Sequence, residues 1–352
     1  MVNINTHTFV WKERLRCFMA PNIRDIARMA GVSVATVSKV INNYPHISPK
    51  TKEKVMTVIK DAQFMPNSVA RGLVKGRSMT LGMFLTTGLV HPFFVHILAG
   101  MEDSLKESGF DLLYLSQVNW NPDYSFVRHC MSRNVEGVVV FGFQRFDLNL
   151  DELVQSEIPA IFIDLDMLGK KAGYVTSDNV DGIRKSVRYL KEIGHTRIAF
   201  LTGGLESYVG KLRFEGYKQG LADLGLPYLS EYVYIGDFSR ESGIEATQKF
   251  LSLDNRPTAI VCSSDMGAVG VIEAMKEAGL SVPGDMSVIG FDDIDIATHT
   301  VPSLTTIRQD TFGIGQNSIR LLLEIINNAN CPPPTMIVPT ELVVRDSCAP
   351  LA

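Results

Sequence analysis

The sequence has few cysteines and no closely spaced pair of them. Its 352 residues include five cysteines, an odd number at wide spacing without a CxxC motif, which argues against a disulfide framework or a cysteine-bound zinc site. No apolar run approaches the roughly 20 residues of a membrane span. No apolar segment follows the charged residues near the N-terminus, as a signal peptide would require. We therefore expect reduced thiols in a cytoplasmic protein without a membrane partner.

The motifs of common enzyme classes are also missing. There is no GxSxG or HExxH motif, and the seven histidines are scattered. The stretch from Gly204 to Lys211 resembles a phosphate-binding loop, but five residues instead of four separate its glycines, and Leu212 replaces Ser or Thr. We expect no enzyme, no cofactor and no metal site.

The charge that is present is distributed unevenly. Residues 1–77 hold 13 Lys and Arg but only 4 Asp and Glu, whereas residues 78–352 hold 21 and 34. The first segment therefore carries a net charge of +9 and the second a net charge of −13. A basic N-terminal segment on an acidic body is typical of a protein in which one end meets the phosphates of nucleic acid.

Three short helices are expected between residues 20 and 65. In the first, apolar residues recur with helical spacing from Ile23 to Ala30, between an N-cap at Asn22 and a stop at Gly31. Ser33 can cap the second helix, whose buried face is Val37, Val40 and Ile41, and the third begins at Ser48-Pro49. Two short helices joined by a tight glycine-containing turn are typical of a helix-turn-helix headpiece.

The second of these helices is the one that enters the major groove in such a unit. Its outward residues are Val34, Ala35, Ser38 and Lys39. Val34 and Ala35 offer only apolar contact, for instance to a thymine methyl group, whereas Lys39 can reach guanine or a phosphate. An ordinary three-helix domain with small exposed residues is the alternative interpretation.

The segment from Pro66 to Gly76 contains a cap, a very short helical run and then glycine. A helix of this length is marginal alone, and DNA is one partner that can order it. The motifs that precede and include it resemble the lactose-repressor/galactose-repressor family: Asp25-Ile26-Ala27, Ala30-Gly31-Val32-Ser33, Ala35-Thr36-Val37-Ser38 and Ile41-Asn42, followed by Pro66-Asn67 and Ala70-Arg71. The similarity covers residues from about 20 to 347, and residues 1–19 stand outside it as an N-terminal extension, which is expected to be disordered.

The resemblance implies a mode of DNA binding. Residues 66–77 are expected to form a hinge helix that folds in the minor groove of an operator bound by a homodimer, with Leu73 as the apolar wedge that kinks the DNA. It adds to the expected DNA contacts the residues Thr36, Asn42, Asn67, Ala70, Arg71 and Leu73.

From Ser78 onward, apolar runs alternate with amphipathic segments. This pattern predicts parallel sheets covered on both faces, and the number of elements suits two doubly wound subdomains. Strands are expected at 81–85, 112–115, 138–141, 160–163, 198–202, 259–261 and 287–289, and helices at 97–108, 181–193, 214–224, 241–251 and 267–278. The expected fold is a small all-α headpiece plus an α/β body, periplasmic-binding-protein-like by the resemblance, that binds an effector and dimerises. Its subdomains are expected at about 78–178 with 310–335, and at about 179–309 with 336–347.

A ligand in such a body binds outside the strand C-termini, in the cleft between the two halves. The resemblance places effector contacts there at Phe93, Phe94, Asp164, Arg213, Phe238, Ser264, Asp292 and Gln309. Carboxylates with Arg and Gln suit ligands rich in hydroxyl groups, and Phe faces suit sugar rings or bases. Core packing is the alternative for the aromatic residues, and capping of the following helices is the alternative for Asp265 and Asp293.

Two departures from the family pattern bear on the effector. Ser264 stands where several relatives have Asn, and Ser207 stands in the loop where a purine-responsive relative has Arg. Both favour a sugar or sugar derivative over a purine. The resulting hypothesis is a bacterial, nucleoid-associated repressor that binds a palindromic double-stranded DNA operator as a homodimer under effector control. A solute-binding protein of the transport type and a regulator controlled by a phosphocarrier co-repressor are the alternatives.

Overall fold

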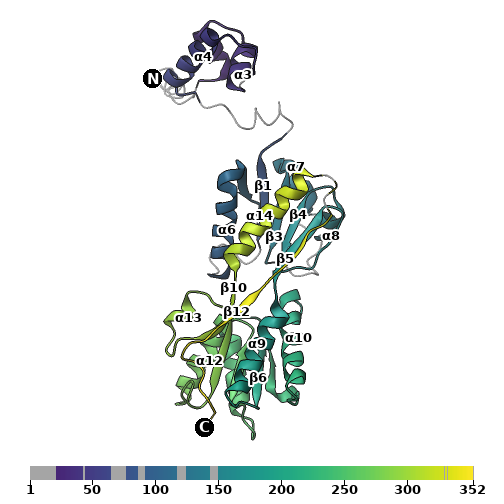
Figure 1. Cartoon of the computed structure of the whole chain (residues 1–352), viewed down its shortest axis with the longest axis vertical. Coiled ribbons are helices and arrows are strands. Elements are labelled where there is room, and N and C mark those ends of the chain that lie inside the picture. The colour runs from purple at the N-terminus through teal and green to yellow at the C-terminus, as the bar shows by residue number, and fades with distance from the viewer. Residues whose placement is uncertain are drawn as a thin grey trace, which may run out of the picture. The chain divides into compact units, whose positions relative to one another are not determined.

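The computed structural model describes residues 21–42, 44–64, 77–85, 92–116, 124–142, 150–328, 330 and 332–351. The chain divides into two compact units, Met1–Ser78 and Met79–Ala352, whose course is drawn in Figure 1. The N-terminal extension and the expected hinge contacts Asn67, Ala70, Arg71 and Leu73 lie outside the described residues. Among the residues described, every helix is too short or too polar to cross a bilayer.

The first unit contains the three expected helices, α2 (Ile23–Ala30), α3 (Val34–Ile41) and α4 (Pro49–Asp61). The side chain of Asn22 accepts hydrogen bonds from the backbone N–H groups of Arg24 and Asp25, and Asp25 accepts one in return, which forms a capping box. Gly31 ends α2 with a φ of 60°, a left-handed conformation that glycine adopts without strain. Ser33 caps α3 by accepting from the N–H of Thr36. These local signals were predictable because each acts within four residues.

The three helices enclose a small apolar core. Ile26, Ala30, Val37 and Val55 are completely buried, and Phe64 closes the core after the last helix. The core leaves one side of α3 exposed, because Val37 and Val40 alone on this helix are buried among its described residues.

The second unit begins with a six-stranded sheet in which every pairing is parallel. The strand order is β11-β5-β4-β3-β1-β2. The strands are β1 (Thr80–Leu85), β2 (Asp111–Tyr114), β3 (Gly137–Phe141), β4 (Ala160–Ile163), β5 (Ala172–Ser177) and β11 (Thr335–Val338). Helices α6 (Pro92–Ser108) and α14 (Thr311–Asn327) pack side by side on one face, and α7 (Phe126–Arg133) and α8 (Leu150–Gln155) cover the other.

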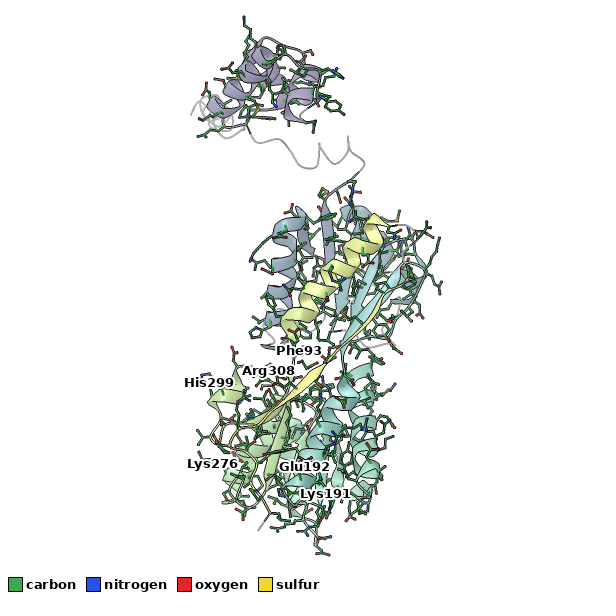
Figure 2. All side chains as sticks on the ribbon, in the orientation of Figure 1. Phe93, Lys191, Glu192, Lys276, His299 and Arg308 are labelled. Carbon is green, nitrogen blue, oxygen red and sulfur yellow. The ribbon has the colours of Figure 1, made fainter. Side chains whose placement is uncertain are left out.

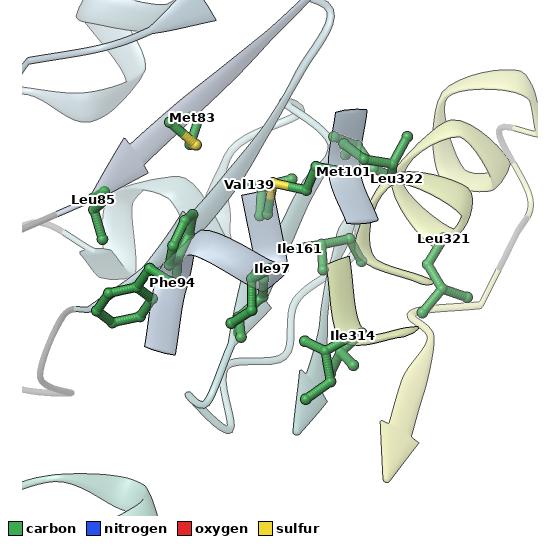
Figure 3. Packing of buried hydrophobic residues seen from close by; sticks show 14 of the residues in the cluster. Met83, Leu85, Phe94, Ile97, Met101, Val139, Ile161, Ile314, Leu321 and Leu322 are labelled. Atoms are coloured by element: carbon green, nitrogen blue, oxygen red, sulfur yellow. The ribbon is translucent and has the colours of Figure 1, made fainter. Parts of the chain in front are cut away.

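Alternate residues of each strand supply the two cores of this subdomain. Val139 and Ile161 join Ile97, Met101 and Leu322 between the sheet and the helices α6 and α14 (Figure 3). Their strand neighbours point to the opposite face and pack against α7 and α8. Because both faces of the sheet are covered, its central strands β3 and β4 are continuous apolar runs, whereas the edge strands β2 and β11 are mostly exposed.

The second sheet has the order β12-β10-β9-β8-β6-β7, parallel except for the antiparallel pair β10 and β12. Its strands are β6 (Ile198–Thr202), β7 (Val233–Ile235), β8 (Ala259–Cys262), β9 (Ser287–Asp292), β10 (Thr305–Gln309) and β12 (Thr340–Val343). Helices α9 (Asn179–Glu192) and α10 (Tyr208–Asp223) cover one face, and α11 (Arg240–Leu251) and α12 (Asp265–Glu277) cover the other. The short elements η1 (Ser230–Tyr232) and α13 (Ile296–His299) complete the subdomain. Two doubly wound α/β subdomains are therefore present, as expected.

The chain passes between the subdomains three times: after β5, after β10, and between β11 and β12. β11 belongs to the first sheet, so the third crossing lies slightly beyond the boundary near residue 335 that the sequence suggested. The first and third crossings are joined by hydrogen bonds, since the N–H of Asp178 donates to the carbonyl of Val338 at 2.8 Å. The hydroxyl of Thr340 donates to the carbonyl of Asp178 at 3.3 Å.

Candidate functional site

The exposed side of α3 carries the residues expected to face DNA. Val34 retains 41% of its exposure, and Ala35 and Lys39 are also exposed. Such apolar side chains at the start of a helix have no packing role here, because the core of the unit is formed by other residues. The geometry leaves these three side chains available for contact in a groove.

The other expected residues of α3 are half-buried and take part in local hydrogen bonds. The hydroxyl of Thr36 lies 2.9 Å from that of Ser33 at the helix start. At the helix end, the side-chain amide of Asn42 donates to the carbonyl of Ser38 at 2.9 Å. Thr36 and Asn42 therefore hold the two ends of α3 in place.

In the second unit, a cavity of about 600 Å³ lies between the C-terminal ends of the strands of the two sheets. Every residue expected to contact an effector lines it, except Gln309. Gln309 lies behind the wall and donates from Nε2 to Oδ1 of Asp292 at 2.7 Å. The lining comprises Phe93, Phe94, Phe141, Gly142, Ile163, Asp164, Ser207, Val209, Arg213, Asp237, Phe238, Ser239, Arg240, Glu241, Ser264, Met266 and Asp292.

The first subdomain provides a mainly apolar wall. Phe93 and Phe94 meet edge to face with ring centres 5.2 Å apart, and Phe94 lies 5.2 Å from Phe141. Phe93 lies at the end of the first subdomain that faces the second (Figure 2). Both Phe93 and Phe94 are only 8% exposed and belong to the hydrophobic core. Core packing and cavity lining are thus performed by the same rings.

Arg213, on α10, is the buried cation of the cavity. Its Nε donates to Oδ1 of Asn179 at 2.7 Å, and its Nη1 donates to the carbonyl of Ser263. Nη1 also lies 3.6 Å from Oδ1 of Asp292, and the guanidinium carbon lies 3.8 Å from the ring centre of Phe291. These contacts compensate for the loss of water around a charge that is 3% exposed.

Two carboxylates face this cation from different subdomains. Asp164 follows β4 in the first subdomain and accepts a hydrogen bond from the hydroxyl of Thr176 at 2.7 Å. Asp292 ends β9 in the second. Burial raises the pKa of Asp164 and raises that of Asp292 to about 7, although the charge of Arg213 acts in the opposite direction on both. Both residues have positive φ angles, 59° and 120°, which are unusual for residues other than glycine and indicate that the surrounding fold holds them there.

Phe238 also has a positive φ angle, 72°, and its ring lies directly over Gly203. A Cβ atom at Gly203 would lie 2.0 Å from this ring, so only glycine permits the contact. The carbonyl of Phe238 accepts a hydrogen bond from Ser264 at 2.8 Å. Ser264 also caps α12 by accepting from the N–H of Gly267 at 3.0 Å, so its hydroxyl has a structural role within the cavity wall.

Asp265 and Asp293 are not the helix caps that the sequence suggested. The cap of α12 is Ser264, and Asp265 is completely buried, with Oδ1 accepting from Thr306 and Oδ2 from the N–H of Ile294. Asp293 instead bridges two guanidinium groups, Arg308 at 2.7 Å and Arg345 at 2.6 Å. Both partnerships join segments far apart in the sequence, which local patterns do not reveal.

The sequence did not point to the start of α11 as part of the wall. Ser239 caps this helix, and Arg240 and Glu241 in its first turn line the cavity. Asp237 precedes them and accepts hydrogen bonds from the hydroxyl groups of Ser239 and Ser242. The available signal was a serine followed by charged residues a few positions after the apolar run of β7. Helix N-termini that follow parallel strands face the ligand cleft.

Comparison with known proteins gives two family matches. Residues 22–67 match the family described as bacterial regulatory proteins, lacI family, and residues 187–348 match a periplasmic binding protein-like domain. The chain is 32% identical over 333 residues to the HTH-type transcriptional repressor PurR of Mannheimia succiniciproducens, covering 94% of this chain and 99% of the relative. It is 31% identical over 331 residues to catabolite control protein A of Priestia megaterium, with the same coverage of both chains.

Solved structures of similar proteins agree with these matches. The lac repressor dimer bound to operator and the anti-inducer ONPF superposes with a TM-score of 0.81 at 29% identity, over 94% of this chain and 100% of that one. A complex of the transcriptional regulator CelR with cellobiose gives a TM-score of 0.71 at 28% identity, over 93% of this chain and 99% of that one. The relatives that carry functional names are transcriptional regulators rather than enzymes.

Proposed function

The chain belongs to the lacI family of bacterial regulatory proteins, and from this premise we propose that it is a repressor that binds a palindromic operator as a homodimer and releases or engages it under the control of a sugar-like effector. The observation that carries the proposal is the combination of an exposed α3 face in one unit with a ligand-sized cavity in the other. The cavity lies within the 300–1,000 Å³ typical of small-molecule sites.

The DNA-binding part of the proposal rests on α3. Val34 and Ala35 are assigned to apolar contact with base edges, and Lys39 is assigned to guanine or a phosphate. The net charge of +9 on residues 1–77 supports attraction to the DNA backbone. The relative whose solved structure is a dimer on its operator matches 94% of this chain, which supports the same assembly here.

The effector part rests on the two walls of the cavity. Because Asp164, Phe93 and Phe94 come from one subdomain and Arg213, Phe238 and Asp292 come from the other, a bound ligand contacts both. A ligand that binds one angle between the subdomains better than another shifts the population toward it, which couples the cavity to the headpiece. Aromatic faces beside carboxylates suit a sugar ring with its hydroxyl groups, and the CelR relative binds cellobiose.

Footprinting and fluorescence anisotropy on palindromic sites from the protein's own promoter region test the DNA-binding proposal. We expect Lys39→Ala to weaken operator binding by about tenfold, as loss of one base or phosphate contact does. Lys276→Ala is the matched control, because Lys276 is an exposed lysine on the second unit (Figure 2). Leu73→Ala is expected to weaken operator binding while leaving ligand affinity unchanged. The proposal would be contradicted if no palindromic site were protected, or if Lys39→Ala and Lys276→Ala changed the operator affinity equally.

The alternatives to this function predict different results. A transport-type solute-binding protein has no use for a headpiece, and residues 22–67 match a DNA-binding family. Control by a phosphocarrier co-repressor predicts that operator affinity rises on addition of the phosphorylated carrier and is unaffected by sugars alone. A thermal-shift screen with sugars and nucleobases, with and without such a carrier, distinguishes these cases, because a ligand stabilises the state that binds it.

A further inference from the structure

We infer that the cavity accepts an uncharged or aminated sugar and rejects the phosphorylated or carboxylated forms of the same sugar. This inference rests on the proposed function, since it names the class of effector for the same cavity. It follows from the charges that line the walls, the partners that the cations already have, and the acceptor capacity that the carboxylates retain.

Acidic side chains outnumber basic ones in the described part of the lining. The acidic members are Asp164, Asp237, Glu241 and Asp292, and the basic members are Arg213 and Arg240. A fifth carboxyl group, Asp265, lies completely buried beside them, and burial together with the charge of Asp292 raises its pKa. An incoming anion therefore meets a site in which carboxyl groups outnumber cations.

Both lining cations are engaged by other groups of the protein. Arg213 donates to Asn179 and to the carbonyl of Ser263, lies 3.6 Å from Asp292 and stacks on Phe291. Arg240 is paired with Glu273 and lies 3.6 Å from Glu241. A phosphate or carboxylate that bound Arg213 would compete with Asp292 for its charge at a poorly solvated position, whereas Arg240 and its carboxylate partners remain in contact with solvent.

The two carboxylates that face the buried cation retain acceptor capacity for a ligand. Asp164 accepts one side-chain hydrogen bond, from Thr176, and Asp292 accepts one from Gln309, both at 2.7 Å. An ionised carboxylate has about four acceptor positions. Hydroxyl or ammonium groups of a ligand can donate to the remaining positions when these carboxyl groups are ionised, whereas a carboxylate or a dianionic phosphate has no proton to donate.

The pKa values of these carboxyl groups indicate that a further negative charge in the cavity is disfavoured. Burial is the main cause that raises the pKa of Asp292, and the charge of Asp164 raises it further. Burial and the charge of Asp292 raise the pKa of Asp265. These carboxyl groups already resist ionisation in one another's presence, so a further fixed negative charge is disfavoured. Because like charges held together in a desolvated site repel each other strongly, we expect an anionic analogue to bind about a hundredfold more weakly than its neutral parent.

The test uses two matched sets of probes on the full-length protein: glucose, glucosamine, glucose 6-phosphate and glucuronate, and the corresponding galactose set with cellobiose added. Thermal shift identifies the compounds that stabilise the protein, and isothermal titration calorimetry measures their dissociation constants at one ionic strength. The expected result is stabilisation by a neutral or amino member and an affinity about a hundredfold lower for its phosphate and uronate. A phosphate or uronate that binds as tightly as its parent overturns the inference, and so does the absence of stabilisation by every neutral and amino member.

Two substitutions separate charge selection from steric exclusion of the larger anions. Asp292→Asn removes a cavity carboxylate with little change of shape and is expected to reduce the preference for the neutral over the anionic probe by about tenfold. Asp164→Asn, on the opposite wall, serves the same purpose if the first variant fails to fold. Glu192→Gln removes a carboxylate on the outer surface of the second subdomain (Figure 2) and should leave the preference unchanged. An unchanged preference in both Asp variants overturns the inference.

The failure of the inference and the failure of the proposed function give different results. Stabilisation by nucleobases alone contradicts a sugar effector. Tight binding of a sugar phosphate leaves the sugar effector intact and contradicts only the charge selection. Absence of operator binding in the footprinting experiment contradicts the proposed DNA binding. It does not change the ligand affinities measured by thermal shift and isothermal titration calorimetry.

Discussion

Asp292 allows a sharp test of the electrostatics of the cavity, because its pKa is raised to about 7 from an ordinary value of 3.8. A carboxyl group with a raised pKa binds a proton more readily in the folded than in the unfolded protein. Its stabilising contribution is fully present below about pH 3.8 and is lost as the pH rises through about 7. The variant Asp292→Asn cannot titrate but keeps an acceptor oxygen for Gln309.

The size of the effect follows from the two pKa values. Proton linkage makes the contribution of Asp292 to the free energy of unfolding ~2 kcal/mol larger at about pH 5.5 than at about pH 8.5. We therefore expect the difference in the free energy of unfolding between the wild type and Asp292→Asn to fall by ~2 kcal/mol from the lower to the higher pH. In melting temperature the change is about 5 °C for a unit of this size. Any pH-independent effect of the substitution cancels in this comparison.

The measurement is urea-induced unfolding of the full-length protein at a series of pH values, followed by far-ultraviolet circular dichroism and evaluated for the transition of the second unit. Glu192→Gln is the control and should give a curve parallel to that of the wild type, since its side chain is exposed. If the curves of the wild type and Asp292→Asn were parallel as well, Asp292 would not titrate in this range. The account of Asp292 as a carboxyl group whose ionisation is disfavoured by burial would then be refuted.

Three further predictions concern other parts of the chain. Hydrogen bonds from Ser239 and Ser242 lower the pKa of Asp237, so the contribution of its carboxylate to stability is present above about pH 3.8 and is lost in more acidic solution. Because the side chain is exposed, Asp237→Asn should lower the free energy of unfolding at neutral pH by no more than about 1 kcal/mol. Calorimetry at a series of pH values should show that the stabilities of the variant and the wild type converge in acid. Ser33→Ala removes the cap of α3 and is expected to lower headpiece stability by about 1 kcal/mol, measured by thermal unfolding, whereas Ser33→Asp should restore it. Gly100→Ala places a methyl group 2.0 Å from the carbonyl oxygen of Phe312. It should therefore separate α6 from α14 and destabilise the second unit by about 1–3 kcal/mol. An unchanged denaturation midpoint would contradict this close packing of the two helices.

The strands that were predicted most closely from the sequence are uninterrupted runs of buried apolar residues. β3, β4, β6 and β8 are runs of apolar residues, and the expected ranges 138–141, 160–163, 198–202 and 259–261 coincide with them or fall short of them by a single residue. The strands β5, β7, β10, β11 and β12 were not expected. β10 shows why: it contains the buried residues Thr305 and Thr306, and Thr306 is satisfied by Asp265 on another element. A partner so distant in the sequence cannot be read from a local pattern.

Helices were predicted where their apolar stripe is regular, but their starts were placed too late. The expected helix 97–108 begins at Pro92 in the structure, and the expected helix 214–224 begins at Tyr208. α14 was not among the expected helices, although Ile314, Leu321 and Leu322 on it are buried. The early turns matter most for function, because those of α6 and α10 carry Phe93, Arg213 and Ser207 at or beside the cavity.

The candidate site was predictable as a set of residues, chiefly through the family resemblance, but the individual contacts were not. Ser264 was expected only as an effector contact, yet it also caps α12 and binds the carbonyl of Phe238. Gln309 acts on Asp292 from behind the wall. These arrangements depend on which strand ends lie side by side. The order of strands in a doubly wound sheet cannot be predicted from the sequence of any single segment.

The three crossings of the chain have a consequence for how the protein is made. The first sheet is completed by β11, at Thr335–Val338, and one of its covering helices is α14, so neither subdomain is a continuous stretch of the chain. During synthesis, the edge of β5 in the first sheet remains unpaired until the second subdomain has been almost entirely translated. A premature stop codon anywhere before residue 335 therefore leaves both halves unfinished rather than one intact half, and exposes a strand edge that invites aggregation.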